Sequence, residues 1–178
     1  MSERLQWRAA PTKPYRCSGN LMFAPADILS TTVQVLQSNR GLETACFWLG
    51  TTATNGSSKA FVVVVPRQIN RARNFSIPGN SMLQVAELAR PREWTVVAAI
   101  HSHPGDDVEH SEYDDQMTAS RRALSIVFPQ YGKWRGPWAK GVGVHEYMDQ
   151  YWHLLPEEDA KRRIEFSGRE PVQVVDLR

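Results

Sequence analysis

Short apolar runs, typical of buried strands, alternate along the chain with segments whose apolar residues recur every three or four positions. The clearest runs are residues 44–50 (T-A-C-F-W-L-G), 60–66 (A-F-V-V-V-V-P), 94–100 (W-T-V-V-A-A-I) and 124–128 (L-S-I-V-F). Runs of this length and composition predict strands. The first two flank Asn55-Gly56, a strong hairpin-turn signal, so they are predicted to pair as a β-hairpin. Weaker patterns predict further strands over residues 15–23, 142–147, 151–155 and 171–177.

Four segments show the apolar spacing that is typical of a helix. After Pro25, one face collects apolar residues as far as Leu36, and the helix is expected to end near residues 38–41. A second helix is predicted over residues 82–89, before Pro91, a third over residues 111–123, and a short charged one after Pro156. Strands and helices that interleave in this way favour a mixed α/β (α+β) fold, with helices packed on a mixed sheet.

Two segments show neither the apolar pattern of a strand nor the spacing of a helix. Residues 67–80 are basic and rich in Asn and Pro, and residues 129–141 contain Tyr131, Trp134 and Trp138 among Gly and Pro. Arginines and aromatics in loops suit partner binding. The alternative, left open here, is that the tryptophans cover the core. Residues 1–14 are polar, with two prolines, and are expected to form a flexible lead-in to one domain over residues 15–178.

Composition is that of an ordinary globular domain. Of 178 residues, 42% are hydrophobic and 22% charged, enough to build a core without disulfides. Two cysteines, Cys17 and Cys46, fit a reducing compartment, and 21 basic against 19 acidic residues give no reason to expect nucleic-acid binding. The N-terminus has no apolar signal-peptide region, and aliphatic runs such as Val62–Val65 are too short for a membrane span. We expect a cytoplasmic protein that binds neither nucleic acid nor membrane.

Candidate chemistry is concentrated in H-S-H-P and the acidic stretch after it. Alternate residues of a strand face one way, so His101 and His103 are expected to project together from the end of the 94–100 strand. Asp114, on the first turn of the next predicted helix, would add a carboxylate. Two histidines and one carboxylate leave a fourth position open, which is the layout of a catalytic zinc site.

The same residues also have plainer interpretations. An H-x-H pair occurs by chance, and Ser111 to Asp114 (S-E-Y-D) is a variant of the helix capping box. Asp106, Asp107, Glu109 and His110 are expected to be solvated loop residues rather than ligands.

The joint spacing changes this balance. H-S-H-P, the seven residues from Pro104 to His110, and then S-x-x-D resemble the JAMM motif of the MPN/JAB metalloproteases. That family also carries an upstream E-x-x-x-x-L-x-G, matched here by residues 43–50, with Glu43 lying 58 residues before His101. Cys46 departs from the Gly that many members have at that position. The resemblance covers residues 15–155 and implies a curved mixed sheet with flanking helices, like that of the cytidine deaminases.

The resemblance implies a function and a role for each residue. His101, His103 and Asp114 would bind one Zn²⁺, Glu43 would be the general base, and Ser111 would stabilise the oxyanion. The reaction would be hydrolysis of the bond after the C-terminal tail of a ubiquitin-like protein, in deconjugation or precursor processing. The chain is most similar to compact prokaryotic deubiquitinase-like members, which are often encoded beside ubiquitin-activating and ubiquitin-conjugating homologues, some in antiviral defence.

Three alternatives stay open. Some MPN domains are catalytically silent scaffolds, although every motif position is filled here. The same chemistry would serve a peptidase that acts on a sulfur-carrier protein or a small amino-acid adduct. A cysteine hydrolase using Cys46 is the third alternative, but the apolar strand around Cys46 favours a buried, inert thiol.

Overall fold

The computed structural model describes residues 15–118 and 120–178, so the predicted lead-in over residues 1–14 lies outside the described part. The elements, in chain order, are β1 (Met22–Ala24), α1 (Ile28–Gln37), β2 (Ala45–Thr52), β3 (Ser58–Val65), β4 (Ile69–Asn70), β5 (Phe75–Ser76), α2 (Gly79–Ala89), the 3₁₀ turn η1 (Arg90–Arg92), β6 (Thr95–Ser102), α3 (Glu112–Met117), β7 (Leu124–Phe128), the 3₁₀ turn η2 (Gln130–Gly132), β8 (Gly143–Met148), β9 (Tyr151–Leu154), α4 (Glu157–Arg163), β10 (Ile164–Phe166) and β11 (Gln173–Asp176).

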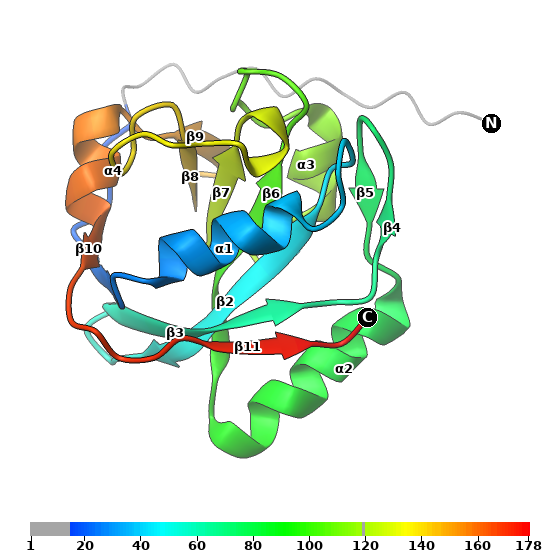
Figure 1. Cartoon of the computed structure of the whole chain (residues 1–178). Coiled ribbons are helices and arrows are strands. Elements are labelled where there is room, and N and C mark those ends of the chain that lie inside the picture. The colour runs from blue at the N-terminus through cyan, green and yellow to red at the C-terminus, as the bar shows by residue number, and fades with distance from the viewer. Residues whose placement is uncertain (1–14, 119) are drawn as a thin grey trace.

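One mixed sheet organises the described residues (Figure 1). Its strand order is β10-β1-β3-β2-β6-β7-β8-β9, and β11 pairs in parallel with the second half of β3. The central pairs β3–β2 and β2–β6 are antiparallel, whereas β6 and β7 run parallel. The predicted hairpin of β2 and β3 and the mixed α/β class are both confirmed.

Helices on both faces explain why β2 is buried and without polar side chains from Ala45 to Gly50. Its Cys46 and Trp48 pack with α1 residues, while its Phe47 and Leu49 pack with α2 residues. Successive side chains of a strand point to opposite faces, so α1 and α2 cover opposite sides of the sheet. The Trp48 indole donates a hydrogen bond of 2.8 Å to Thr32 of α1, which fixes that helix against the sheet.

The sheet is curled, so that its two edge regions meet. Arg163, which leads into β10 at one edge, donates to the carboxylate of Glu146 on β8 at 3.2 Å. Tyr15 also donates to Glu146 and stacks on His153 of β9, with ring centroids 4.0 Å apart. A curved mixed sheet of this kind agrees with the expected architecture.

Several predicted elements differ from the structure. The strand expected over residues 15–23 is reduced to β1, and the helix expected over residues 111–123 ends at Met117, since Thr118 leaves the helical conformation at φ −77°, ψ 86°. Residues 67–80, expected to be irregular, contain the small hairpin of β4 and β5. Two-residue strands are too short to show an alternating pattern, which is why the sequence concealed them.

The tryptophans of residues 129–141 lie against the core rather than standing free. Trp134 makes an edge contact with Phe128, and Trp138 makes one with Phe166. The Trp134 indole also donates to the Lys140 carbonyl at 2.8 Å. These contacts favour the interpretation in which the tryptophans cover the core.

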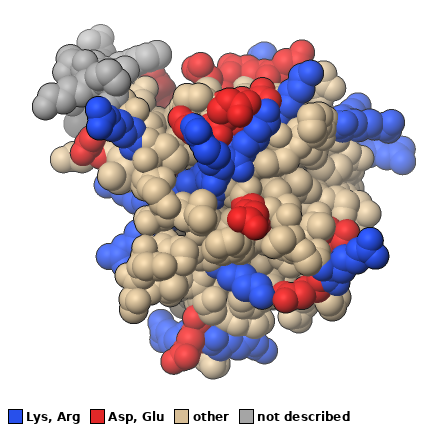
Figure 2. Space-filling model, turned by 90° about the vertical axis from the view of Figure 1, so that its left-hand side faces the viewer, with Lys and Arg blue, Asp and Glu red and all other residues tan. Residues whose placement is uncertain are grey.

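The surface charge is mixed. On the face shown in Figure 2, basic and acidic side chains lie interspersed, in keeping with a net charge of +2. Within residues 15–118 and 120–178, no helix combines the length and apolarity needed to cross a bilayer.

Candidate metal centre

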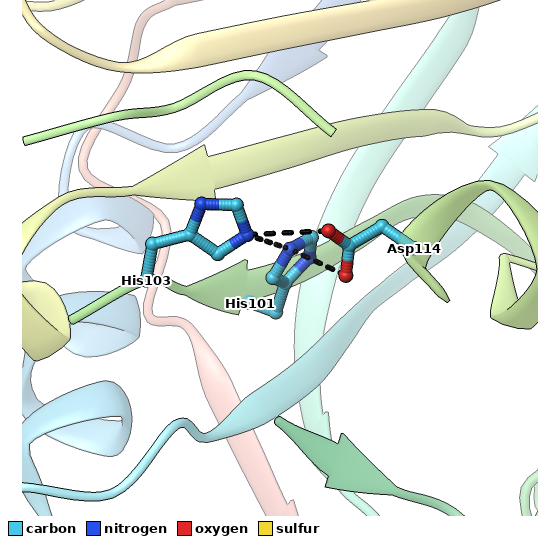
Figure 3. A group of neighbouring side chains, drawn as sticks. All are labelled: His101, His103 and Asp114. Atoms are coloured by element: carbon cyan, nitrogen blue, oxygen red, sulfur yellow. Dashed lines mark hydrogen bonds and ion pairs between the residues drawn. The ribbon is translucent and has the colours of Figure 1, made fainter. Parts of the chain in front are cut away.

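Two histidines meet at the carboxyl end of β6. His101 is the penultimate residue of the strand and is 3% exposed, and His103 follows one residue after the strand ends. Their Nε2 atoms lie 3.1 Å apart, so both rings point toward one place, as Figure 3 shows. The expectation that they project together is confirmed.

Asp114 comes to the same place from α3. Its Oδ1 lies 3.2 Å from His101 Nε2 and its Oδ2 lies 3.3 Å from His103 Nε2. Ser111 begins the helix: its backbone N–H donates to Asp114 Oδ2 at 2.8 Å, and its hydroxyl donates there at 2.6 Å. The capping box is therefore present, and it orients the carboxylate that faces the histidines.

The donor set fits a metal ion. His101, His103 and Asp114 each offer a ligand atom, and these atoms lie within 4.8 Å of one another. The Nδ1 atom of His103 lies 2.9 Å from the Asp107 carbonyl. A carbonyl can only accept, so Nδ1 carries the proton and Nε2 keeps a free lone pair for a metal. Two imidazole nitrogens and one carboxylate suit zinc.

The electrostatics of the cluster favour an ionised carboxylate. Burial opposes ionisation of Asp114, but the adjacent rings of His101 and His103 and the Ser111 hydroxyl outweigh it and hold the pKa of Asp114 well below its usual range. Burial lowers the pKa of His101, which keeps that ring neutral, as a metal ligand must be.

Glu43 is placed by strand register. Ala45 of β2 lies opposite His101 of β6, and continuing this antiparallel register by two residues sets Glu43 across from His103. Ser102 reinforces the pairing, because its N–H donates to the Thr44 carbonyl at 3.1 Å and its hydroxyl accepts from Thr44 N–H at 3.2 Å. Ser102 therefore helps to position Glu43 through the backbone of its neighbour Thr44.

The environment of Glu43 suits proton transfer. The residue is 5% exposed, and burial raises its pKa to about 7, with the nearby His103 opposing the shift and the Asp114 carboxylate adding to it. A carboxyl group that titrates near neutrality can both take up and release a proton at physiological pH.

Two side-chain amides secure the Glu43 backbone. Gln68 donates to the Ala45 carbonyl and accepts from the Ala45 N–H, both at 2.8 Å, as a neighbouring strand would. Asn70 on β4 donates to the Glu43 carbonyl at 2.7 Å, and the Glu43 N–H donates to the Arg71 carbonyl at 2.8 Å. Sequence reasoning missed Gln68 and Asn70, because isolated amides in an irregular segment carry no periodic signal.

The last residue of E-x-x-x-x-L-x-G, Gly50, stands where the structure leaves no room for a side chain. A Cβ atom there would lie 1.7 Å from the Lys59 carbonyl oxygen of β3. The β2–β3 register also shifts between Leu49 and Gly50, so the two backbones approach closely at this bulge.

Cys46 lies on the same strand but is fully buried in the core. Burial raises the pKa of its thiol far above its usual range, so the sulfur stays protonated. Nothing in this environment activates it as a nucleophile.

An apolar cavity of about 250 Å³ adjoins the group formed by His101, His103 and Asp114. Its lining includes Phe75, Ile77, Met82 and Met117 together with the ligands His101 and Asp114. A small apolar group bound there would lie directly beside the metal position.

One loop residue does not match its expected role. His110 was predicted to be a solvated loop residue, yet its side chain is only 4% exposed and lies against the site. By contrast, Asp106, Asp107 and Glu109 are exposed, as expected.

Comparisons with known proteins identify the family of this chain. A family model described as prokaryotic homologs of the JAB domain matches residues 25–139, a span that contains Glu43 and the three clustered ligands. A solution structure from Desulfitobacterium hafniense superposes with a TM-score of 0.64 at 10% identity, covering 83% of this chain and 93% of that one. Another, from Salinibacter ruber, gives 0.53 at 17% identity, covering 76% and 89%. These two likenesses show the fold alone, whereas the family match covers most of the sequence: the chain belongs to the prokaryotic homologues of the JAB domain.

Proposed function

We propose that this protein is a zinc-dependent peptidase or isopeptidase that hydrolyses the bond after the C-terminal tail of a ubiquitin-like protein. The observation that carries the proposal is the meeting of His101, His103 and Asp114 at one strand end, with the buried Glu43 opposite. When bound by these three ligands, zinc would supply a Lewis acid that polarises a carbonyl and makes water nucleophilic near neutral pH.

The chain's own residues would handle the protons. Glu43, with a pKa of about 7, would accept a proton from the attacking water and deliver it to the leaving amine. Ser111 is exposed, and its hydroxyl, now directed at Asp114, would rotate to donate to the oxygen on which negative charge develops. Ser111 would thus cap α3 and assist the reaction from the same position.

The surroundings of the site support a peptide tail as substrate. The apolar cavity next to His101 would receive one apolar side chain of the tail, while the hairpin of β4 and β5 would flank the extended backbone. Homologues of ubiquitin-activating and ubiquitin-conjugating enzymes would be the natural functional partners of such an activity, and antiviral defence is one context for it.

The test combines metal binding with cleavage. Apo protein is titrated with zinc and then assayed on a ubiquitin-like protein fused through its tail to a reporter, on an isopeptide conjugate, and on a sulfur-carrier adduct. We expect stoichiometric zinc and cleavage directly after the tail. Asp114→Ala should lose both properties, because one of three ligands is gone.

Other outcomes would identify the alternatives. Cleavage of the sulfur-carrier adduct alone would reassign the substrate class. Wild-type protein that binds no zinc, or that binds a ubiquitin-like protein without cleaving anything, would favour a silent scaffold and contradict the proposal.

A further inference from the structure

We propose that His110 is a positioning residue for the metal centre, acting through a hydrogen-bonded chain that we name the His110 bridge: Asp115, His110 and Ser125. The inference rests on the proposed zinc site, since its effect would be to hold Ser111 and Asp114 where that site needs them. It concerns metal affinity and geometry rather than a chemical step.

Both ring nitrogens of His110 are engaged. Nδ1 lies 2.9 Å from Asp115 Oδ1, and Nε2 lies 2.8 Å from Ser125 Oγ. A carboxylate only accepts, so Nδ1 carries the proton and Nε2 accepts from the Ser125 hydroxyl. One side chain thereby joins α3 to β7 by two oriented hydrogen bonds.

The residues of the bridge flank those of the site in the chain, so the bridge can hold the site residues in place. His110 immediately precedes Ser111, and Asp115 immediately follows Asp114, so the bridge ties down both flanks of the S-x-x-D unit. Its anchor, Ser125, lies on β7 beside Ala99 of β6, the strand that carries His101. Strand β6, which carries His101, and helix α3, which carries Asp114, are therefore joined through β7 as well as at the proposed metal position.

Helix α3 needs such an anchor because it is short. It has six residues, and the segment from Pro104 to His110 before it contains no helix or strand. A helix of this length has little stability of its own, so tertiary contacts must fix its orientation.

The ring of His110 is also held from its face. It stacks on His145 with centroids 3.9 Å apart and planes 22° from parallel, and it contacts Trp152 at 5.2 Å. His145 is 1% exposed and meets His110 through the face of its ring. The stack and the two hydrogen bonds together leave His110 one orientation.

The hydrogen bonds run from Ser125 to His110 to Asp115, as they do in the catalytic triad of a serine hydrolase. The burial of Ser125 rules out that role. Ser125 is fully buried within β7 and is 0% exposed, so no substrate carbonyl can reach its hydroxyl. A nucleophilic serine must be reachable by substrate. The geometry therefore points to positioning.

The experiment measures zinc affinity of apo protein by competition with a chromogenic chelator, independently of any activity. His110→Ala and Ser125→Ala should weaken zinc binding by about 10-fold, the lower end of the effect of losing a direct partner of a ligand, because the bridge holds the residues that flank Ser111 and Asp114 rather than a ligand itself. Asp115→Asn, whose amide oxygen still accepts from Nδ1, should retain more affinity than Asp115→Ala.

The matched control is His153→Ala. His153 is another buried histidine, on β9, with a hydrogen bond to the Met148 carbonyl and a stacked partner in Tyr15. Its loss should lower the melting temperature while leaving zinc affinity unchanged. Ser125→Ala removes one hydroxyl group and keeps the test decisive if His110→Ala does not fold.

The outcomes separate this inference from the proposed function. Wild-type protein that binds zinc, together with folded His110→Ala and Ser125→Ala variants that bind it equally well, would overturn the bridge and leave the function standing. Wild-type protein that binds no zinc would overturn both.

Discussion

At the level of single residues, the site depends on a carboxyl group kept in an unfavourable place. Glu43 is buried, and among residues 15–118 and 120–178 only His103 favours its ionised form by charge, so ionisation of Glu43 costs folding free energy. A group arranged in this way serves chemistry better than stability, which is common for catalytic acids and bases.

Replacing Glu43 with Gln should therefore stabilise the protein, and only at higher pH. The folded-state pKa of about 7 lies above the ordinary 4.5, so the folded state binds this proton more tightly than the unfolded chain. The resulting stabilisation is complete below about pH 4.5 and is lost as the pH rises through 7. Glu43→Gln should melt several degrees above wild type at about pH 8 and level with it at about pH 4.

Thermal unfolding monitored by circular dichroism measures this difference. Glu109→Gln, in the exposed loop, serves as the control and should show no such pH dependence. Equal melting temperatures for Glu43→Gln and wild type at about pH 8 would show that the carboxyl group is not held at a raised pKa.

Ser111 has two separable contributions. Ser111→Ala should lose about 1 kcal/mol of stability through the missing helix cap. If the hydroxyl also stabilises the oxyanion, kcat should fall by about 10²- to 10³-fold. Ser111→Thr keeps the hydroxyl and should recover most of both. Steady-state kinetics in which Ser111→Ala keeps the wild-type kcat would limit Ser111 to capping.

Among the elements, the small hairpin of β4 and β5 contacts two sides of the site. The Gln68 side chain just before it and the Asn70 side chain within it bind the backbone of Glu43 and Ala45, while Tyr113 of α3 donates to the Phe75 carbonyl at 2.7 Å. The hairpin thus joins the segment before β2, which bears the proposed base, to the helix that bears a proposed ligand.

Gln68→Ala should misplace the base without disturbing the metal. We expect kcat to fall by about 10- to 100-fold, as small displacements of a catalytic group do, with zinc affinity unchanged. Arg71→Ala is the control, because the Arg71 carbonyl that accepts from Glu43 is retained. A wild-type kcat in Gln68→Ala, measured on the zinc-loaded protein, would contradict this role.

Gly50 belongs to the contact between β2 and β3. Gly50→Ala forces a Cβ into the Lys59 carbonyl, and the strands must separate to relieve the overlap. We expect a loss of about 1–3 kcal/mol or more in urea unfolding. Gly105→Ala, where an added Cβ meets nothing within 4 Å, should cost little, and an equal effect of the two substitutions would refute the steric explanation.

For the molecule as a whole, the sequence predicted best what depends on local pattern. The long apolar runs were predicted to be strands, and they form β2, β3, β6 and β7, which are consecutive neighbours in the sheet. The spacing of H-S-H-P and S-x-x-D likewise located residues that the structure brings together.

The features that could not be predicted from the sequence depend on contacts between distant segments. The pairing of β10 with β1, and the ion pair from Arg163 to Glu146, join segments more than a dozen residues apart and leave no local signal. His110 resembled a loop residue because its polar neighbours are solvated, whereas its own burial comes from β7 and β8. Burial by distant elements is the information that single-sequence patterns lack.

The proposed mechanism separates metal binding from proton transfer, and Glu43→Ala tests that separation directly. Zinc content and cleavage of a ubiquitin-like fusion are measured in parallel on wild type and on this variant. We predict about one zinc per chain in both proteins and turnover only in wild type, since the base is not a ligand. Cleavage by Glu43→Ala at the wild-type rate, or wild-type protein without zinc, would contradict a zinc peptidase that uses Glu43 as its base.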